Sequence, residues 1–142
     1  MGIEENKALV KRFFEAGNNI QGDLSKIQPW VDEFLSPIHI HHTPMGDHTL
    51  DISLQFYQMI FSAFPDLVEN INDVIAEGDK VVVSVTNTAT HKGAFQGIPA
   101  TGKKVVFNAV DIFRVVDGKI TDEWSFPDQL GMMQQLGVIP AN

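Results

Sequence analysis

Hydrophobic residues in the first half of the chain recur every three or four positions, as they do in amphipathic helices. This spacing predicts helices over residues 4–18, 23–35 and 49–64. The third stretch carries apolar side chains on two faces, so we expect it to lie between two layers of the fold. A Ser-Pro pair separates the second helix from a short extended segment over residues 38–43.

The second half is rich in β-branched and aromatic residues and predicts four strands, over residues 67–76, 80–92, 103–116 and 119–126. Glycine-containing turns join the first pair and the last pair into hairpins. A helix over residues 128–136 follows Pro127, with Asp128 as its N-cap. This order indicates an α+β fold, an antiparallel sheet with the helices on one face, in a single domain over residues 1–142.

Composition narrows the classes of partner and site. The chain has 142 residues, 44% of them hydrophobic, and a formal net charge of −8 from 18 acidic and 10 basic residues. Without a run of Lys or Arg, neither nucleic acid nor an anionic membrane is an expected partner. The lack of cysteine excludes disulfides, thiolate metal ligands and cysteine nucleophiles. No signal peptide or membrane-spanning stretch is visible, so a cytoplasmic protein is expected.

The segment Gly97–Lys103 fits most of a phosphate-binding GxxxxGK pattern. The next residue is Lys104 rather than the Ser or Thr that holds magnesium, and the segment lies between two strands instead of before a helix. We therefore interpret it as a strand connection.

Histidines gather on the expected extended segment, at His39, His41 and His42. Alternation along a strand places His39 and His41 on one face, which we expect to be solvated, and turns His42 inward. A bulge beside Pro44 is the alternative, and it could turn either His42 or Thr43 inward. A zinc or iron site stays open as an alternative, but no metal is expected because three convergent ligands do not follow from the spacing. His48 is interpreted as a surface turn residue.

Two carboxylates interrupt the apolar pattern of the last hairpin, Asp111 and Glu123. A three-residue loop over 116–118 would place them opposite each other, whereas a two-residue turn would place Asp111 opposite Trp124. Two carboxyls on an apolar face resist ionisation, which raises the pKa of at least one toward neutrality, as an acid/base catalyst needs. The alternative is that both carboxyls face solvent or pair with a basic side chain. His91 and Asn108 could line the same pocket or could be satisfied polar residues at strand ends.

Motifs over nearly the whole chain occur together: Lys11-Arg12-Phe13-Phe14, His42-Thr43-Pro44, residues 90–103, Asp111-Ile112-Phe113-Arg114, Asp117-Gly118-Lys119-Ile120, Glu123-Trp124 and Asp128-Gln129-Leu130-Gly131. In combination they resemble the SnoaL-like polyketide cyclase family. The resemblance implies the nuclear transport factor 2-like α+β cone, a curved sheet wrapped around helices and an apolar pocket. It further implies a homodimer through the outer sheet face, no cofactor, and ring closure on a polyketide ester by intramolecular aldol condensation with a pocket carboxylate as acid/base.

Ketosteroid isomerases share the cone, and the resemblance places their pocket acid at Asp111. Their base before the proline falls on Thr43 and their helix-one tyrosine on Phe13, so isomerase activity is not implied. The chain also departs from the cyclase pattern at Phe14, Glu123 and Ser125, where tyrosine, histidine and aspartate are frequent. These departures leave the fold intact and bear on whether polyketide cyclisation is inherited.

The leading hypothesis is a cyclase- or isomerase-type enzyme that moves a proton beside a carbonyl of a small apolar ligand. Asp111 would be the principal acid/base with Glu123 as its partner, and His91 and His42 would polarise or orient the substrate. The expected substrate contacts are Phe14, Tyr57, Asn108, Phe113, Trp124 and Ser125, with Trp124 a wall only under the two-residue turn. The alternative is a non-catalytic ligand-binding or dimerisation module on the same fold.

Overall fold

The computed structural model describes residues 2–140. Its helices are α1 (Ile3–Asn18), the 3₁₀ turn η1 (Leu24–Lys26), α2 (Ile27–Phe34), α3 (Leu50–Ala63) and α4 (Gln129–Leu136). Its strands are β1 (Leu35–Thr43), β2 (Gly46–His48), β3 (Val68–Glu77), β4 (Lys80–Thr90), β5 (Lys104–Val116) and β6 (Lys119–Pro127). The predicted α+β class and the closing helix are confirmed.

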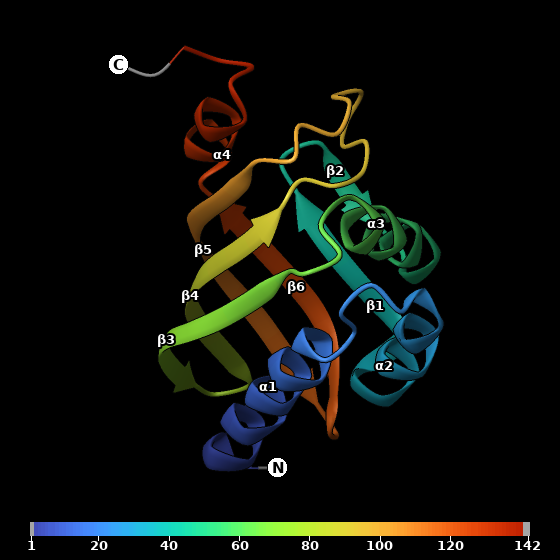
Figure 1. Cartoon of the computed structure of the whole chain (residues 1–142). Helices are drawn as coiled ribbons and strands as arrows, with labels where there is room; N and C mark the ends of the chain where they lie inside the picture. The colour runs from blue at the N-terminus through green and yellow to red at the C-terminus, as the bar shows by residue number, and fades with distance from the viewer. Residues whose placement is uncertain (1, 141–142) are drawn as a thin grey trace.

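The strands form one curved sheet in the order β2-β1-β6-β5-β4-β3. Neighbours are antiparallel except β1 and β6, which run parallel, so the sheet is mixed rather than wholly antiparallel. Helices α1, α2 and α3 lie on one face of this sheet, and α4 lies at one end of it (Figure 1). The sheet therefore has an inner face against the helices and an outer face that no helix covers.

Aromatic packing joins the helices to the inner face. Phe13 of α1 stacks on Trp30 of α2 at 4.7 Å between ring centroids and meets Phe113 of β5 edge-on at 5.8 Å. The indole Nε1 of Trp30 donates a hydrogen bond of 2.9 Å to the carbonyl oxygen of Phe13. Gly17 is required beside this pair, since a Cβ there would lie 3.1 Å from the Trp30 ring. The amphipathic pattern predicted for α1 is thus the pattern that builds the core.

Strand alternation places every second side chain of β4 inside. Val81, Val83 and Val85 are buried, and Asn87 and Ala89 continue the same inward series. Each pairs across the sheet with an inward residue of β5. The inner face is therefore apolar at one end and gains polar side chains further along β4.

The histidines of β1 face the opposite way from the prediction. His39 and His41 are buried, whereas His42 is partly exposed on the outer face. Strand β1 begins at Leu35, and its pairing with β6 is irregular between Leu35 and Ile40. This irregularity changes which face of the sheet each following side chain points to. Because the side chains alternate between faces, His42 does not converge with the other two. His48 lies in β2 rather than in a turn, opposite His41.

The β5–β6 hairpin adopts neither predicted register. Asp117-Gly118 is a two-residue turn with both residues at positive φ, and Val116 pairs with Lys119. A bulge then shifts the pairing between Arg114 and Val115, so Asp111 lies opposite Ser125. The inserted residue restores the alternation, which is why Asp111 and Glu123 still share the inner face.

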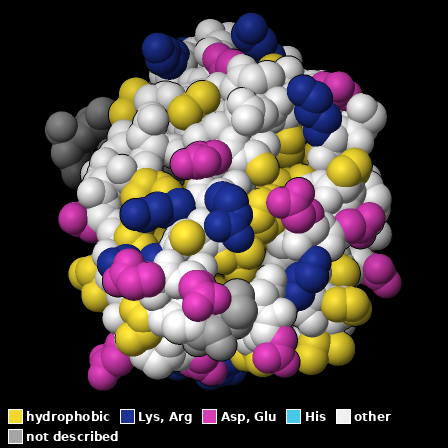
Figure 2. All heavy atoms as spheres, turned by 90° about the horizontal axis from the view of Figure 1, so that it is seen from below, with side chains coloured by type: hydrophobic (Ala, Val, Ile, Leu, Met, Phe, Trp, Pro, Cys, Tyr) yellow, Lys and Arg dark blue, Asp and Glu magenta, His cyan; other side chains and the backbone are white. Residues whose placement is uncertain are grey.

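Surface charge is mixed. Figure 2 shows acidic and basic side chains interspersed over the face seen from below, without a large cluster of one sign. Within residues 2–140 no helix is long and apolar enough to cross a membrane. Asp128 caps α4 as predicted, accepting a hydrogen bond of 2.9 Å from the backbone N–H of Gly131.

Candidate active site

A cavity of about 190 Å³ lies between the inner face of the sheet and the helices. Its walls are mostly aromatic and aliphatic, and they include Phe14 and Trp30 from the first two helices and Tyr57 from α3. Phe95 and Gln96 of the loop after β4 and Met132 of α4 also line it. Such a site suits a small, largely apolar molecule.

Three carboxyl groups line this cavity, from Asp111, Glu123 and Glu69, and they come from three different strands. His41, Ser125 and Asn87 add polar side chains. No Lys or Arg is among the lining residues described. Each carboxyl must therefore be stabilised as a neutral group or by hydrogen bonds.

Asp111 lies at the centre of the inner face and is 7% exposed. Burial raises the pKa of its carboxyl to about 6, and a hydrogen bond from the Ser125 side chain opposes this rise. A carboxyl with a pKa near 6 is mostly ionised at neutral pH and takes up a proton readily. These are the properties of a general base that must later return its proton.

Burial favours the neutral form of the Glu123 carboxyl. Burial raises its pKa well above the usual value, and the nearby charges of Asp111 and Glu69 raise it further. The Tyr57 hydroxyl donates to Glu123 Oε2 at 3.4 Å, and burial also raises the pKa of that phenol. The carboxyls of Asp111 and Glu123 therefore differ in pKa, and Asp111 ionises at the lower pH.

His41 completes this end of the cavity. Its Nε2 atom lies 3.6 Å from Glu123 Oε2. Burial lowers the pKa of His41 to about 4, with the neighbouring His48 and His42 acting in the same direction. Burial favours the neutral form of both side chains, so their contact is polar rather than an ion pair.

The predicted contacts Phe14, Tyr57, Phe113 and Ser125 line the cavity together with Asp111 and Glu123. Their roles remain predictions. Sequence reasoning missed the polar lining residues His41, Glu69 and Asn87. A usable signal existed for Asn87, since it continues the inward alternation of Val81, Val83 and Val85.

Four other predicted residues lie outside the cavity lining. Trp124 is on the outer face, where its ring stacks on His42 at 4.6 Å, because the bulge turns Glu123 and Ser125 inward instead. His42 is hydrogen-bonded there by Asp47 and Asp122, each at 2.8 Å. The inward position predicted for His42 is wrong, and Trp124, predicted as a cavity wall only for the two-residue-turn register, does not line the cavity.

Asn108 and His91 have other structural partners. Asn108 is on the outward face of β5 and accepts a hydrogen bond of 3.1 Å from the Thr86 hydroxyl. His91 is buried against Phe64, and its Nδ1 lies 3.0 Å from the Thr101 hydroxyl oxygen. His91 therefore ties together the two ends of the loop before β5 and does not face the cavity.

The chain is similar in sequence to a family of polyketide cyclases. A profile of the SnoaL-like polyketide cyclase family matches residues 8–136. Aklanonic acid methyl ester cyclase DnrD from Streptomyces peucetius is 30% identical over 132 residues, covering 91% of this chain and 88% of that protein. Nogalonic acid methyl ester cyclase from Streptomyces nogalater is 40% identical over 47 residues, covering 33% of this chain and 35% of that protein.

Solved structures agree with these relatives. AclR from Streptomyces galilaeus, a proposed hydroxylase, superposes with a TM-score of 0.87 at 30% identity, covering 99% of this chain and 86% of that one. TsrD from Streptomyces laurentii superposes with a TM-score of 0.81 at 28% identity, covering 98% of this chain and 99% of that one.

Fold and cavity together define an α+β cone with a deep apolar site. The chain belongs to the SnoaL-like polyketide cyclase family. The resemblance seen in its motifs is confirmed, and with it the expectation of a cyclase-type enzyme.

Proposed function

We propose that this enzyme closes a ring on a polyketide ester by intramolecular aldol chemistry, with Asp111 as the acid/base. The observation that carries the proposal is the placement of Asp111 and Glu123 in one apolar cavity with unlike pKa values. The cyclase relatives act on methyl esters of aklanonic and nogalonic acid, so a related polycyclic ester is the proposed substrate class.

The proposed step moves one proton and forms one carbon–carbon bond. The Asp111 carboxylate removes a proton from the carbon beside a carbonyl, and the resulting enolate attacks a second carbonyl of the same molecule. The new alkoxide then takes the proton back from Asp111. Substrate and product are isomers, and no cofactor takes part in this sequence.

Glu123 and Tyr57 supply the complementary role. Both groups are held protonated by burial, and their oxygens lie 3.4 Å apart. With substrate bound, the Tyr57 hydroxyl turns from Glu123 to the enolate oxygen, and the two neutral O–H groups then stabilise that oxygen without a net charge of their own. Neutral His41 beside Glu123 is placed to orient that carboxyl.

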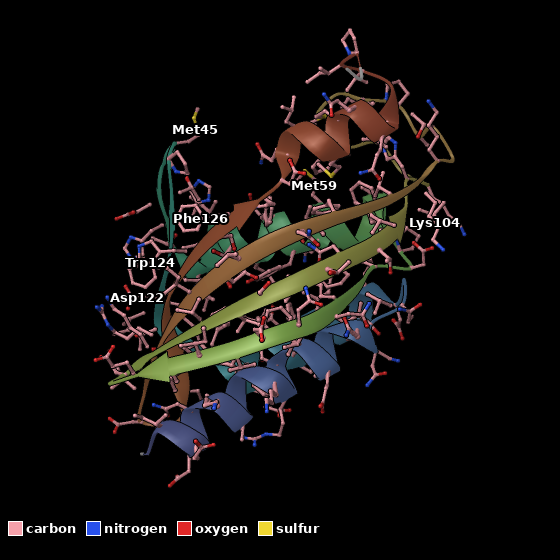
Figure 3. All side chains as sticks on the ribbon, turned by 90° about the vertical axis from the view of Figure 1, so that its left-hand side faces the viewer. Met45, Met59, Lys104, Asp122, Trp124 and Phe126 are labelled. Atoms are coloured by element: carbon pink, nitrogen blue, oxygen red, sulfur yellow. The ribbon has the colours of Figure 1, made fainter. Side chains whose placement is uncertain are left out.

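The proposal includes a homodimer through the outer sheet face. On this face, one row of paired residues across β3, β4, β5 and β6 is apolar: Ile75, Val82, Ile112 and Trp124. Phe126 lies in the neighbouring row and is 55% exposed. Figure 3 shows Asp122, Trp124 and Phe126 following one another along β6, close to the β1–β2 tip at Met45. An apolar patch of this kind fits a second copy of the chain, and light scattering of wild type and Phe126→Lys tests it.

A cytoplasmic location is likewise part of the proposal, and cell fractionation tests it.

Turnover assays test the proposed reaction. The purified protein is incubated with aklanonic acid methyl ester, and the product is followed by chromatography and mass spectrometry. Cyclisation yields an isomer of unchanged mass. A hydroxylase, the class proposed for AclR, would add one oxygen atom and would need an oxidant, so an oxygenated product would support that second function instead.

A further inference from the structure

The cavity has a second polar pair, Glu69 and Asn87, that the proposed reaction does not use. Glu69 of β3 pairs directly with Asn87 of β4, and Asn87 pairs with Phe107 of β5. Asp111 is four residues further along β5, with Ala109 between them on the inner face. The Glu69–Asn87 pair is thus two rows of the sheet away from the row of Asp111.

The amide oxygen of the buried Asn87 side chain accepts no hydrogen bond from residues 2–140. Asn87 is 5% exposed and lines the cavity. A buried amide oxygen left in this state costs free energy that a donor group on a ligand would recover. The atom therefore points to an O–H or N–H donor in the bound molecule.

Glu69 is held in place by its main chain. Asn18, at the end of α1, accepts from the backbone N–H of Glu69 at 2.8 Å and donates to its carbonyl oxygen at 3.0 Å. This double hydrogen bond replaces the missing neighbour strand at the sheet edge. Burial, with the charge of Asp111, raises the pKa of Glu69 to about 8, so its carboxyl is a neutral donor and acceptor near pH 6.

We propose that Glu69 and Asn87 form a specificity subsite that binds a hydroxyl group of the substrate distinct from its reacting carbonyl. The hydroxyl donates to Asn87 Oδ1 and accepts from Glu69. The substrate class is then a largely apolar molecule that carries a hydroxyl group in addition to its reacting carbonyl. This inference rests on the proposed cavity function, and it assigns the subsite a role in binding rather than in proton transfer.

Binding of simple planar phenols tests the subsite without any turnover. Two pairs of probes differ by one hydroxyl: 2,6-dihydroxynaphthalene with 2-naphthol, and 2,6-dihydroxyanthraquinone with 2-hydroxyanthraquinone. Dissociation constants are measured at pH 6, where Glu69 is neutral, by quenching of protein fluorescence. The wild type is expected to prefer the dihydroxy member of at least one pair by about tenfold, the contribution of one neutral hydrogen bond.

Substitutions at Asn87 and Glu69 test whether these two side chains cause the preference for the dihydroxy probe. Asn87→Leu and Glu69→Leu should each abolish it, while Glu69→Gln should retain it because an amide also donates and accepts. Asn108→Leu is the matched control, an asparagine on the next strand that faces outward, and it should leave the preference unchanged. Circular dichroism of each variant establishes that it is folded, and the two Leu variants act on different strands, so failure of one to fold leaves the other informative.

Equal binding of both members of each pair by the wild type would overturn the subsite, as would a preference that survives Asn87→Leu and Glu69→Leu. Tighter binding of a probe with a protonated aminomethyl group in place of the second hydroxyl would also overturn it, because a cation requires an ionised Glu69. Failure of the proposed reaction gives a different result: the wild type would not turn over the ester, while its preference for the dihydroxy probe would be unchanged.

Discussion

Asp111 lies directly opposite Ser125 in the β5–β6 ladder, and the Ser125 side chain donates a hydrogen bond to the Asp111 carboxyl. This pairing follows from the bulge that shifts β6 by one residue after the Asp117-Gly118 turn. Ser125 therefore tunes the carboxylate that it faces across the ladder.

Removing the serine hydroxyl should raise the pKa of Asp111. The hydrogen bond from Ser125 opposes the effect of burial, so Ser125→Ala leaves burial to act alone. The limb of kcat/KM that reports ionisation of Asp111 is then expected at higher pH than in the wild type. A pH–rate profile of both proteins measures this, and an unmoved limb would show that Ser125 does not act on Asp111.

Tyr57→Phe should lower turnover with little change in KM. The phenol is proposed to act on the enolate oxygen, which carries charge only after proton removal, so its loss weakens the transition state more than the bound substrate. We expect kcat to fall about a hundredfold to a thousandfold, the usual cost of one such donor. Steady-state kinetics measure both constants, and a rise in KM at unchanged kcat would place Tyr57 in binding alone.

Glu69→Gln should stabilise the protein at high pH. The folded-state pKa of Glu69 is raised from 4.5 to about 8, so its contribution to stability is fully present below pH 4.5 and is lost as pH rises through 8. Glutamine does not ionise and escapes this loss. Melting temperatures of the two proteins should differ little at pH 5, and the variant should melt several degrees higher at pH 9. A constant difference across this range would contradict a buried Glu69 carboxyl.

His42 should stabilise the β1–β2 hairpin in a pH-dependent way. Hydrogen bonds to Asp122 and Asp47 raise the pKa of His42 above 6.5, so the stabilisation is full below 6.5 and is lost as pH rises through the folded-state pKa. Because the pair is near the surface, the effect should be about 1 kcal/mol or less. Melting curves of wild type and His42→Gln should converge as pH rises, and curves that converge on acidification between pH 6.5 and 5 would contradict this assignment.

Much of the architecture could be predicted from local patterns. The helical spacing around Phe13 and the alternation of Val81, Val83 and Val85 depend only on which side chains must be buried. The shared face of Asp111 and Glu123 was only one of two open alternatives, the one that a three-residue loop would give. The register could not be predicted, because a single inserted residue in β6 changes which pairs face each other and no local pattern indicates it.

The remaining site residues depended on tertiary packing. His41 faces the cavity because β1 runs parallel to β6, a pairing between strands about 80 residues apart in the chain. Glu69 lies on an edge strand whose backbone is completed by Asn18 of α1. A polar residue in an alternating strand can face either the solvent or the interior. Only the position of the helices against the sheet shows which of these polar side chains lie in the cavity.

The central claim is that Asp111 moves the proton. Asp111→Asn keeps the size and hydrogen bonding of the side chain but removes its basicity, and Asp122→Asn, on the outer face of the sheet, is the matched control. With aklanonic acid methyl ester as substrate, we expect kcat to fall at least a hundredfold for Asp111→Asn, with substrate binding retained. Turnover by Asp122→Asn should stay close to that of the wild type. Turnover by Asp111→Asn within a few-fold of the wild type would show that Asp111 does not move the proton.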